Sequence, residues 1–180
     1  MVVYTVGHST RSIDELVAIL HDAGVTRAAD VRAFPMSRRH PQFNRDALMV
    51  SLPGAGIDYR HMPELGGRRP SKKGAPSRNG LWKVDAFRNY ADYAETPAFA
   101  AALDTLERLA RERPTAVMCA EALWWQCHRR LVADYLLARG WTVTHLLALG
   151  QPQAGTLTPG AVPQRDGTIW YPPKQPGLLA

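Results

Sequence analysis

Polar side chains that suit anion binding and proton transfer follow three apolar segments of the chain. The first cluster is Gly7-His8-Ser9-Thr10-Arg11, which joins an apolar run to the start of a helical pattern. Glycine permits a tight turn there, and free amides and hydroxyls at such a turn can hold an anion. The same residues also fit a polar turn whose hydroxyls only satisfy backbone groups. The sequence has no glycine-rich dinucleotide motif or Walker motif, which disfavours the usual forms of those sites.

Asp30 and Arg32 form the second cluster and flank the apolar Val31. Because side chains alternate along a strand, both are expected on the same side of a predicted strand end. Arg32 can bind a phosphate or carboxylate through two parallel hydrogen bonds, with Asp30 orienting it or acting as a base. A structural Asp–Arg pair has the same pattern, so both interpretations stay open.

The third cluster joins Cys119 and Glu121, at the end of an apolar run, to Cys127, His128 and Arg129 at a predicted helix start. The helix dipole lowers the pKa of a cysteine in that position. Glu121 and His128 are candidates for proton transfer, and Arg129 is a candidate anion clamp. A free cysteine also packs as a small apolar residue, and a histidine can serve packing alone. Glu121 is harder to explain structurally, because a carboxylate next to a buried strand is costly without a partner.

Metal binding is an alternative use of the same side chains. Cys119, Glu121, Cys127, His128 and His8 include types that ligate zinc. Their spacing matches no standard zinc finger or ribbon, so we expect no metal and no cofactor, with zinc as the alternative. A redox pair of the two cysteines lacks the usual two-residue spacing.

A basic segment gives a separate signal. Between Arg27 and Arg88 the chain has 13 Lys/Arg against 5 Asp/Glu, and the formal net charge of the whole chain is +6. Residues 64–80 have no periodicity and are rich in glycine, proline and cations, which indicates a long basic loop. In this loop Glu64, Gly66 and Gly67 can form a lid over an anionic ligand. The candidates for nucleic-acid contact are Arg68, Arg69, Lys72 and Lys73, and an ordinary solvated loop has the same composition.

The elements that must position these clusters alternate along the chain. Short apolar runs predict strands at 2–6, 26–31, 57–61, 115–119 and 143–147. Helical periodicity predicts helices between them, with a capping box at Ser12 and Glu15 and further helix starts at Asn44 and Thr96. Five strands separated by helices indicate a three-layer α/β fold, with helices on both faces of a mostly parallel sheet. In such folds ligands bind beyond the carboxyl ends of the strands, where all three clusters are expected.

A length of 180 residues suits one domain. We expect a single α/β domain over residues 1–150 and a proline-rich tail, 151–180, that packs on the surface or is partly disordered. The N-terminus has no basic leader, no window approaches the ~20 apolar residues of a membrane span, and the chain has 2 cysteines. We therefore expect a cytoplasmic protein with no membrane partner.

Taken together, the clusters resemble a known family. Their order is similar to that of the signature blocks of domain-of-unknown-function family 488. The blocks are residues 5–11 (TVGHSTR), 30–32 (DVR) with Pro35 and Ser37, 64–67 (ELGG), and 119–121 (CAE) with 127–129 (CHR). The resemblance implies a small α/β domain and supports the site, but it brings no established reaction. A fainter resemblance links DVR and Cys119 to sulfurtransferase and cysteine-phosphatase domains. Those domains place an anion-binding loop directly after the nucleophile, whereas Arg129 lies ten residues beyond Cys119.

The leading hypothesis is a hydrolase or transferase that acts on a nucleotide, a nucleic acid or another phosphorylated ligand. Its anion clamp consists of Arg32, Arg129 and the turn at Ser9. Glu121 acts as base or acid with help from His8 or His128, and full activity of Glu121→Gln would remove that role. One alternative is a non-catalytic nucleic-acid-binding module, whose affinity must fall steeply with salt. Another is a thiol-dependent, sulfurtransferase-like enzyme, which requires a cysteine pKa below about 8.5.

Overall fold

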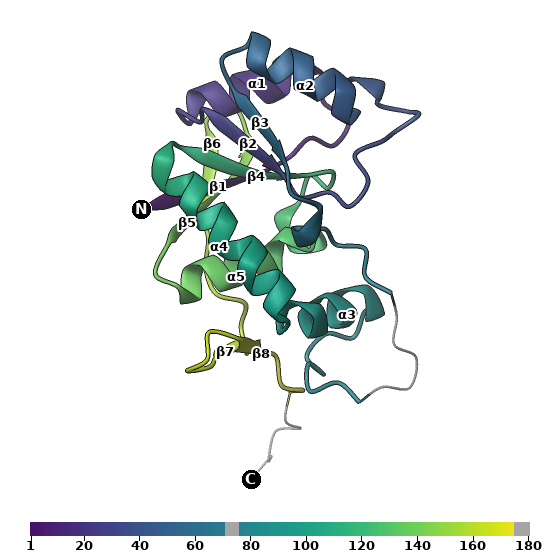
Figure 1. Cartoon of the computed structure of the whole chain (residues 1–180), viewed down its shortest axis with the longest axis vertical. Coiled ribbons are helices and arrows are strands. Elements are labelled where there is room, and N and C mark those ends of the chain that lie inside the picture. The colour runs from purple at the N-terminus through teal and green to yellow at the C-terminus, as the bar shows by residue number, and fades with distance from the viewer. Residues whose placement is uncertain (71–75, 175–180) are drawn as a thin grey trace.

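Apolar strands and amphipathic helices build a six-stranded sheet in the order β3-β2-β4-β1-β5-β6 (Figure 1). The computed structural model describes residues 1–70 and 76–174. The strands of this sheet are β1 (Val2–Gly7), β2 (Arg27–Asp30), β3 (Asp58–His61), β4 (Thr115–Cys119), β5 (Thr142–Ala148) and β6 (Gln151–Ala154). All neighbouring pairs are parallel except β5 with β6. The predicted α/β class and mostly parallel sheet are confirmed, and β6 is an additional strand.

Five α-helices in the described residues cover the two faces of this sheet. They are α1 (Ile13–Asp22), α2 (Arg45–Gly54), α3 (Asp85–Ala94), α4 (Pro97–Glu112) and α5 (Arg129–Ala138). Figure 1 shows α1 and α2 on one side of the sheet and α3, α4 and α5 on the other, which is the predicted three-layer arrangement. None of the described helices combines the length and apolarity needed to cross a membrane.

Local signals set the starts of two of these helices as predicted. Ser12 and Glu15 form a complete capping box at α1, and the Thr96 hydroxyl accepts from the Phe99 amide at α4. Asn44 occupies the N-cap position of α2, but its side chain accepts a hydrogen bond from the Ser37 amide at 2.6 Å instead of capping the helix. The Asn44 side chain therefore anchors the preceding loop.

The alternation of side chains along β4 divides its residues between the two cores. Ala116 and Met118 pack with the residues of α1 and α2, whereas Val117 and Cys119 pack with the residues of α4 and α5. Cys119 is the last residue of β4, so its side chain lies at the carboxyl edge of the sheet, on the α5 side.

The centre of the sheet contains the point where the chain changes direction. β1 and β4 are neighbours, with Gly7 paired to Cys119, yet α1 follows β1 on one face and α5 follows β4 on the other. Connections that leave adjacent parallel strands toward opposite faces open a crevice between them. The sequence clusters after β1, β2 and β4 all border this crevice.

Residues after the sheet pack against α5. A short hairpin of β7 (Val162–Pro163) and β8 (Ile169–Trp170) follows β6. The buried Asp134 of α5 accepts hydrogen bonds from the Thr158 amide at 2.8 Å and the Tyr171 hydroxyl at 2.9 Å. Because Tyr171 is fully buried, residues 158–171 complete one side of the core around α5.

Candidate functional site

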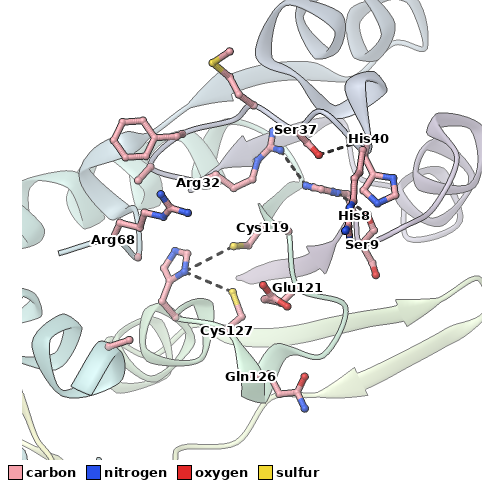
Figure 2. A pocket seen from close by; sticks show the side chains of 18 of the residues that line it. His8, Ser9, Arg32, Ser37, His40, Arg68, Cys119, Glu121, Gln126 and Cys127 are labelled. Atoms are coloured by element: carbon pink, nitrogen blue, oxygen red, sulfur yellow. Dashed lines mark hydrogen bonds between the residues drawn. The ribbon is translucent and has the colours of Figure 1, made fainter. Parts of the chain in front are cut away.

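A cavity of about 820 Å³ lies at the carboxyl ends of β1, β2 and β4 (Figure 2). The sequence-predicted residues that line it are His8, Ser9, Thr10, Arg32, Gly67, Arg68, Cys119, Glu121, Cys127 and His128. The other predicted residues in the described chain lie outside its lining: Gly7, Arg11, Asp30, Glu64, Gly66, Arg69 and Arg129. Three short 3-10 helices, η1 (Pro41–Phe43), η2 (Pro63–Leu65) and η3 (Trp124–Gln126), lie in the connections around it.

Two thiols and one imidazole meet at the floor of the cavity. His128 Nδ1 lies 3.6 Å from the Cys127 sulfur and 3.8 Å from the Cys119 sulfur. Figure 2 marks these two contacts with dashed lines that end at Cys119 and Cys127. On the other side of the ring, Nε2 lies 3.1 Å from the Val31 carbonyl oxygen. That carbonyl can only accept, so Nε2 carries the proton and Nδ1 presents its lone pair to the sulfurs.

The two thiols have opposite acid–base behaviour. The hydrogen bond with Cys127 and then burial raise the pKa of Cys119. Burial also opposes ionisation of Cys127, but the hydrogen bond from Cys119 and the positive charge of Arg129 outweigh it and lower its pKa. The charge of Glu121, which lines the same cavity (Figure 2), opposes this lowering. Of the two sulfurs, Cys127 is therefore the one that ionises first.

Arg32 is fully engaged in a buried network. Its Nε and Nη2 atoms donate to the two oxygens of Asp30 at 2.8 and 2.6 Å, and Nη2 also donates to the Phe43 carbonyl at 2.9 Å. Asp30 has no exposed surface and also accepts from the Tyr59 hydroxyl at 2.7 Å. The geometry is that of the structural Asp–Arg pair, which the sequence could not distinguish from an anion clamp.

The remaining terminal nitrogen of Arg32 positions His8. Arg32 Nη1 donates to His8 Nε2 at 3.0 Å, and His8 Nδ1 lies 3.0 Å from the Ser9 carbonyl. Burial and then the charge of Arg32 lower the pKa of His8 to about 4. The ring is therefore neutral near pH 7, with its basic nitrogen already hydrogen-bonded. Ser9 itself has a left-handed backbone with φ of 49°, which is uncommon for a residue with a side chain.

Arg129 lies beneath the cavity and holds its wall together. It is 1% exposed, and its two terminal nitrogens donate to the carbonyls of Glu121 at 2.5 Å and Ala122 at 2.8 Å. Within residues 1–70 and 76–174, its Nε has no hydrogen-bond partner and no carboxylate forms an ion pair with it. Arg129 thus ties the start of α5 to the loop after β4, which brings Cys127 back to Cys119.

Glycines allow the walls to approach each other. A Cβ atom on Gly7 would lie 1.8 Å from the Glu121 carbonyl oxygen, and one on Gly67 would lie 2.5 Å from His128 Nδ1. A Cβ atom on Gly66 would lie 2.9 Å from Ala33. Arg11 reinforces this edge by donating to the carbonyls of Gly7 and Leu147. Gly7, Gly66 and Arg11 do not line the cavity, but they hold the backbone segments that form its walls close together.

The segment predicted as a basic lid is partly packed. Arg69 donates to the carbonyls of Gly66 at 2.9 Å and Glu64 at 2.5 Å and lies 3.5 Å from the ring centre of Tyr93. Glu64 is exposed and lies away from the cavity, while Arg68 lines it. Lys72 and Lys73 lie outside the described residues.

The mouth of the cavity includes residues that sequence reasoning missed. These lining residues are Ala33, Phe34, Met36, Arg39, His40, Ala86, Phe87 and Gln126, while Ser37 and Ala120, which also line the cavity, belong to the family-like blocks. Phe34 and Met36 are 69% and 81% exposed, and Arg68 lies 5.9 Å from the Phe34 ring centre. In the part of the chain that the structure describes, neither Arg39 nor Arg68 forms an ion pair. Most of these residues lie in the connection 33–44, where the run of Arg38, Arg39 and His40 was the available signal.

Comparison with known proteins gives one match. The model of the family described as domain of unknown function DUF488 matches residues 12–136. This range contains the clusters after β2 and β4, the Gly66-Gly67 pair and most of α5. No curated protein and no solved structure matches the chain.

Proposed function

This chain belongs to the DUF488 family of α/β domains of unknown function, and from its site geometry we propose that it is an enzyme acting on a phosphorylated ligand. The ligand enters the 820 Å³ cavity. Its phosphate binds at the exposed entrance, and its reacting group lies against the thiols and the imidazole at the opposite end. The reaction is a hydrolysis or a group transfer at the cluster of Cys119, Cys127 and His128, with Glu121 as the acid or base.

One observation carries this proposal: two thiols and an imidazole line a cavity whose exposed Arg39 and Arg68 form no ion pair among the described residues. Two thiols, an imidazole and a carboxylate converge from the end of β4 and the start of α5. Both thiols are buried, the pKa of Cys127 is lowered, and Glu121 is exposed to the same cavity, which makes this cavity an active-site candidate.

The proposed phosphate position follows from which cavity arginines have no ion-pair partner within residues 1–70 and 76–174. Arg32 is paired with Asp30, and Arg129 donates to backbone carbonyls, so both act as positioning residues. Arg39 and Arg68 line the same cavity, and both side chains are exposed. A guanidinium group binds phosphate with strong, charge-assisted hydrogen bonds, which favours Arg39 and Arg68 as the anion site.

A thermal-shift assay tests ligand binding. Purified protein is screened against inorganic phosphate, mononucleotides and sugar phosphates, and a ligand at a hundred times its Kd adds about 2.7 kcal/mol of stability. The shift should disappear in the Arg39→Ala/Arg68→Ala variant and persist in Arg38→Ala, because Arg38 is exposed but lies outside the cavity lining. An equal loss in both variants would show only a general charge effect.

A turnover assay tests the reaction itself. Release of phosphate or of an aryl alcohol from generic aryl phosphates is followed for the wild type and for Glu121→Gln, which preserves shape and removes the charge. Loss of a general acid or base lowers the rate by about 10²–10⁴-fold. Binding of phosphorylated ligands without any turnover, and with no effect of Glu121→Gln, would overturn the enzymatic assignment.

A further inference from the structure

The donor atoms on the cavity floor are arranged as a metal site with one free side. We propose that Cys119, Cys127 and His128 bind one zinc ion, whose fourth coordination position opens into the cavity. This inference rests on the proposed function for the role of the cavity, and it names the group that performs the chemistry there. The binding of zinc itself requires no ligand in the cavity and can be measured alone.

The distances between the donor atoms fit tetrahedral zinc. Zn–S bonds of about 2.3 Å and Zn–N bonds of about 2.0 Å place a sulfur and a nitrogen ligand roughly 3.5 Å apart in a tetrahedral site. His128 Nδ1 lies 3.6 Å from Cys127 Sγ and 3.8 Å from Cys119 Sγ, and all three donor atoms lie within 4.8 Å of one another. Only small side-chain movements are therefore needed to bind the ion.

The orientation of the imidazole is fixed for this task. A histidine that binds zinc usually donates its other N–H to a carboxylate or a backbone carbonyl, which sets the tautomer and the direction of the ring. His128 Nε2 lies 3.1 Å from the Val31 carbonyl oxygen, so Nδ1 has a lone pair directed at the sulfurs. Gly67 lies against the same ring, where a Cβ atom would collide with it, and limits its movement.

The chemistry of the donors selects the metal. Mg²⁺ and Ca²⁺ prefer oxygen ligands, whereas thiolates with an imidazole suit zinc. Two thiolates also balance the two charges of Zn²⁺, so zinc binding to the two thiols adds no net charge to a wall that already contains the buried Arg129. Zinc is therefore the expected occupant.

The number of ligands indicates a reactive site rather than a structural one. Structural zinc is almost always held by four protein ligands, whereas catalytic zinc keeps one position for water or substrate. In residues 1–70 and 76–174, the group contains three ligand side chains, and all three line the cavity. The fourth position therefore faces the cavity, which Glu121 also lines (Figure 2).

An open zinc explains how this site could perform hydrolysis. Zinc lowers the pKa of its bound water to about 7 and so supplies a hydroxide nucleophile at neutral pH. Glu121 can accept a hydrogen bond from that water and orient it. In this arrangement neither cysteine is the nucleophile, because both sulfurs are bound to the metal.

Metal content and cobalt spectroscopy test the site. Protein purified without chelator is analysed for zinc, and metal-free protein is titrated with zinc against a competing chromophoric chelator. We expect one zinc ion per chain in the wild type and in His40→Gln, a variant of a cavity-lining histidine outside the group. Cys119→Ser and Cys127→Ser should lose binding by at least tenfold. Circular dichroism confirms that each variant is folded.

Cobalt replacement gives a second readout that needs no folded variant. Co²⁺ bound to two thiolates in a tetrahedral site shows an intense visible spectrum and a sulfur-to-cobalt charge-transfer band. Zinc should also protect both cysteines of the wild type from thiol reagents. A weak octahedral spectrum, unprotected thiols, or equal zinc binding by wild type and Cys127→Ser would overturn the inference.

The outcomes separate this inference from the proposed function. Zinc binding without any response to phosphorylated ligands would leave the metal site intact and remove the proposed substrate class. Turnover of a phosphorylated ligand by fully metal-free protein, abolished by alkylation of Cys127, would keep the enzyme and replace zinc with a thiolate nucleophile.

Discussion

Gly67 lies so close to the His128 ring that a Cβ atom added to it would come within 2.5 Å of Nδ1 and 2.7 Å of Cγ. The ring is held from the other side by the Val31 carbonyl, 3.1 Å from Nε2. The imidazole is therefore confined between two backbone segments, and its contact with the sulfurs of Cys119 and Cys127 depends on a residue with no side chain.

The first prediction is that Gly67→Ala displaces the imidazole and leaves the fold intact. Overpacking of this kind costs about 1–3 kcal/mol, and movement of a metal-binding ring weakens zinc binding by about 10–100-fold. Chemical denaturation and zinc titration measure the two effects. Gly54→Ala is the matched control, because a Cβ atom there meets nothing within 4 Å. Unchanged zinc affinity in Gly67→Ala would show that the ring is free to adjust.

Gly7→Ala is predicted to be more harmful, because the collision involves backbone on both sides. Its Cβ atom would lie 1.8 Å from the Glu121 carbonyl oxygen and 2.6 Å from the carbonyl carbon. β1 and the loop after β4 must then separate, and we expect a loss of at least about 2 kcal/mol in the free energy of unfolding. Thermal and urea denaturation check the result. If Gly7→Ala lowered the free energy of unfolding by less than Gly67→Ala does, β1 and the loop after β4 could separate at little cost.

Much of this architecture could be predicted from local sequence signals. The run at 115–119 coincides with β4, and the Ser12–Glu15 capping box opens α1. The convergence of the clusters after β1, β2 and β4 follows from a general property of parallel sheets, in which the carboxyl ends of the strands share one edge. The sequence therefore predicted the fold class, and it predicted that these clusters lie close together at one edge of the sheet.

The partner of each charged side chain could not be predicted in the same way. The spacing of Asp30 and Arg32 indicated a possible pair, but only the fold shows that Asp30, Phe43 and His8 occupy the Arg32 guanidinium, and that Arg39 lines the cavity. β6 was missed for a related reason. Its sequence, Gln151-Pro152-Gln153-Ala154, is exposed and has no apolar alternation, because an edge strand needs only backbone pairing with β5.

A third prediction concerns Arg129, whose two terminal nitrogens donate to the carbonyls of Glu121 and Ala122. Arg129→Lys keeps the charge, but a single ammonium group cannot reproduce the planar fork that reaches both acceptors. We expect a loss of about 2–4 kcal/mol, because two buried carbonyls lose charge-assisted hydrogen bonds. Arg108→Lys, at an exposed surface pair, should stay within about 0.5 kcal/mol of the wild type. Equal effects of the two variants would argue against Arg129 as the tie of this loop.

The last prediction is a loss of stability in mild acid that depends on His145. This side chain is 1% exposed, its Nδ1 lies 2.7 Å from the Thr5 hydroxyl, and its ring stacks on Trp124 at 4.3 Å. Burial and then the charge of Arg129 lower its pKa from 6.5 to about 4. Between these two values the unfolded chain binds a proton that the folded chain does not, so the stability rises with pH across this window.

The stabilising contribution of a neutral His145 is therefore complete above pH 6.5 and is lost as the pH falls toward 4. A shift of this size corresponds to roughly 3 kcal/mol, and His8, whose pKa is also lowered to about 4, adds to the same trend. Urea denaturation at pH 7, 6 and 5 measures the slope for the wild type and for His145→Gln, which cannot titrate. A smaller slope in the variant is expected because a histidine whose pKa is lowered in the folded protein has been removed. If both proteins lost stability in parallel, the acid sensitivity would arise elsewhere, and the burial of an uncharged ring beside Arg129 would not be its cause.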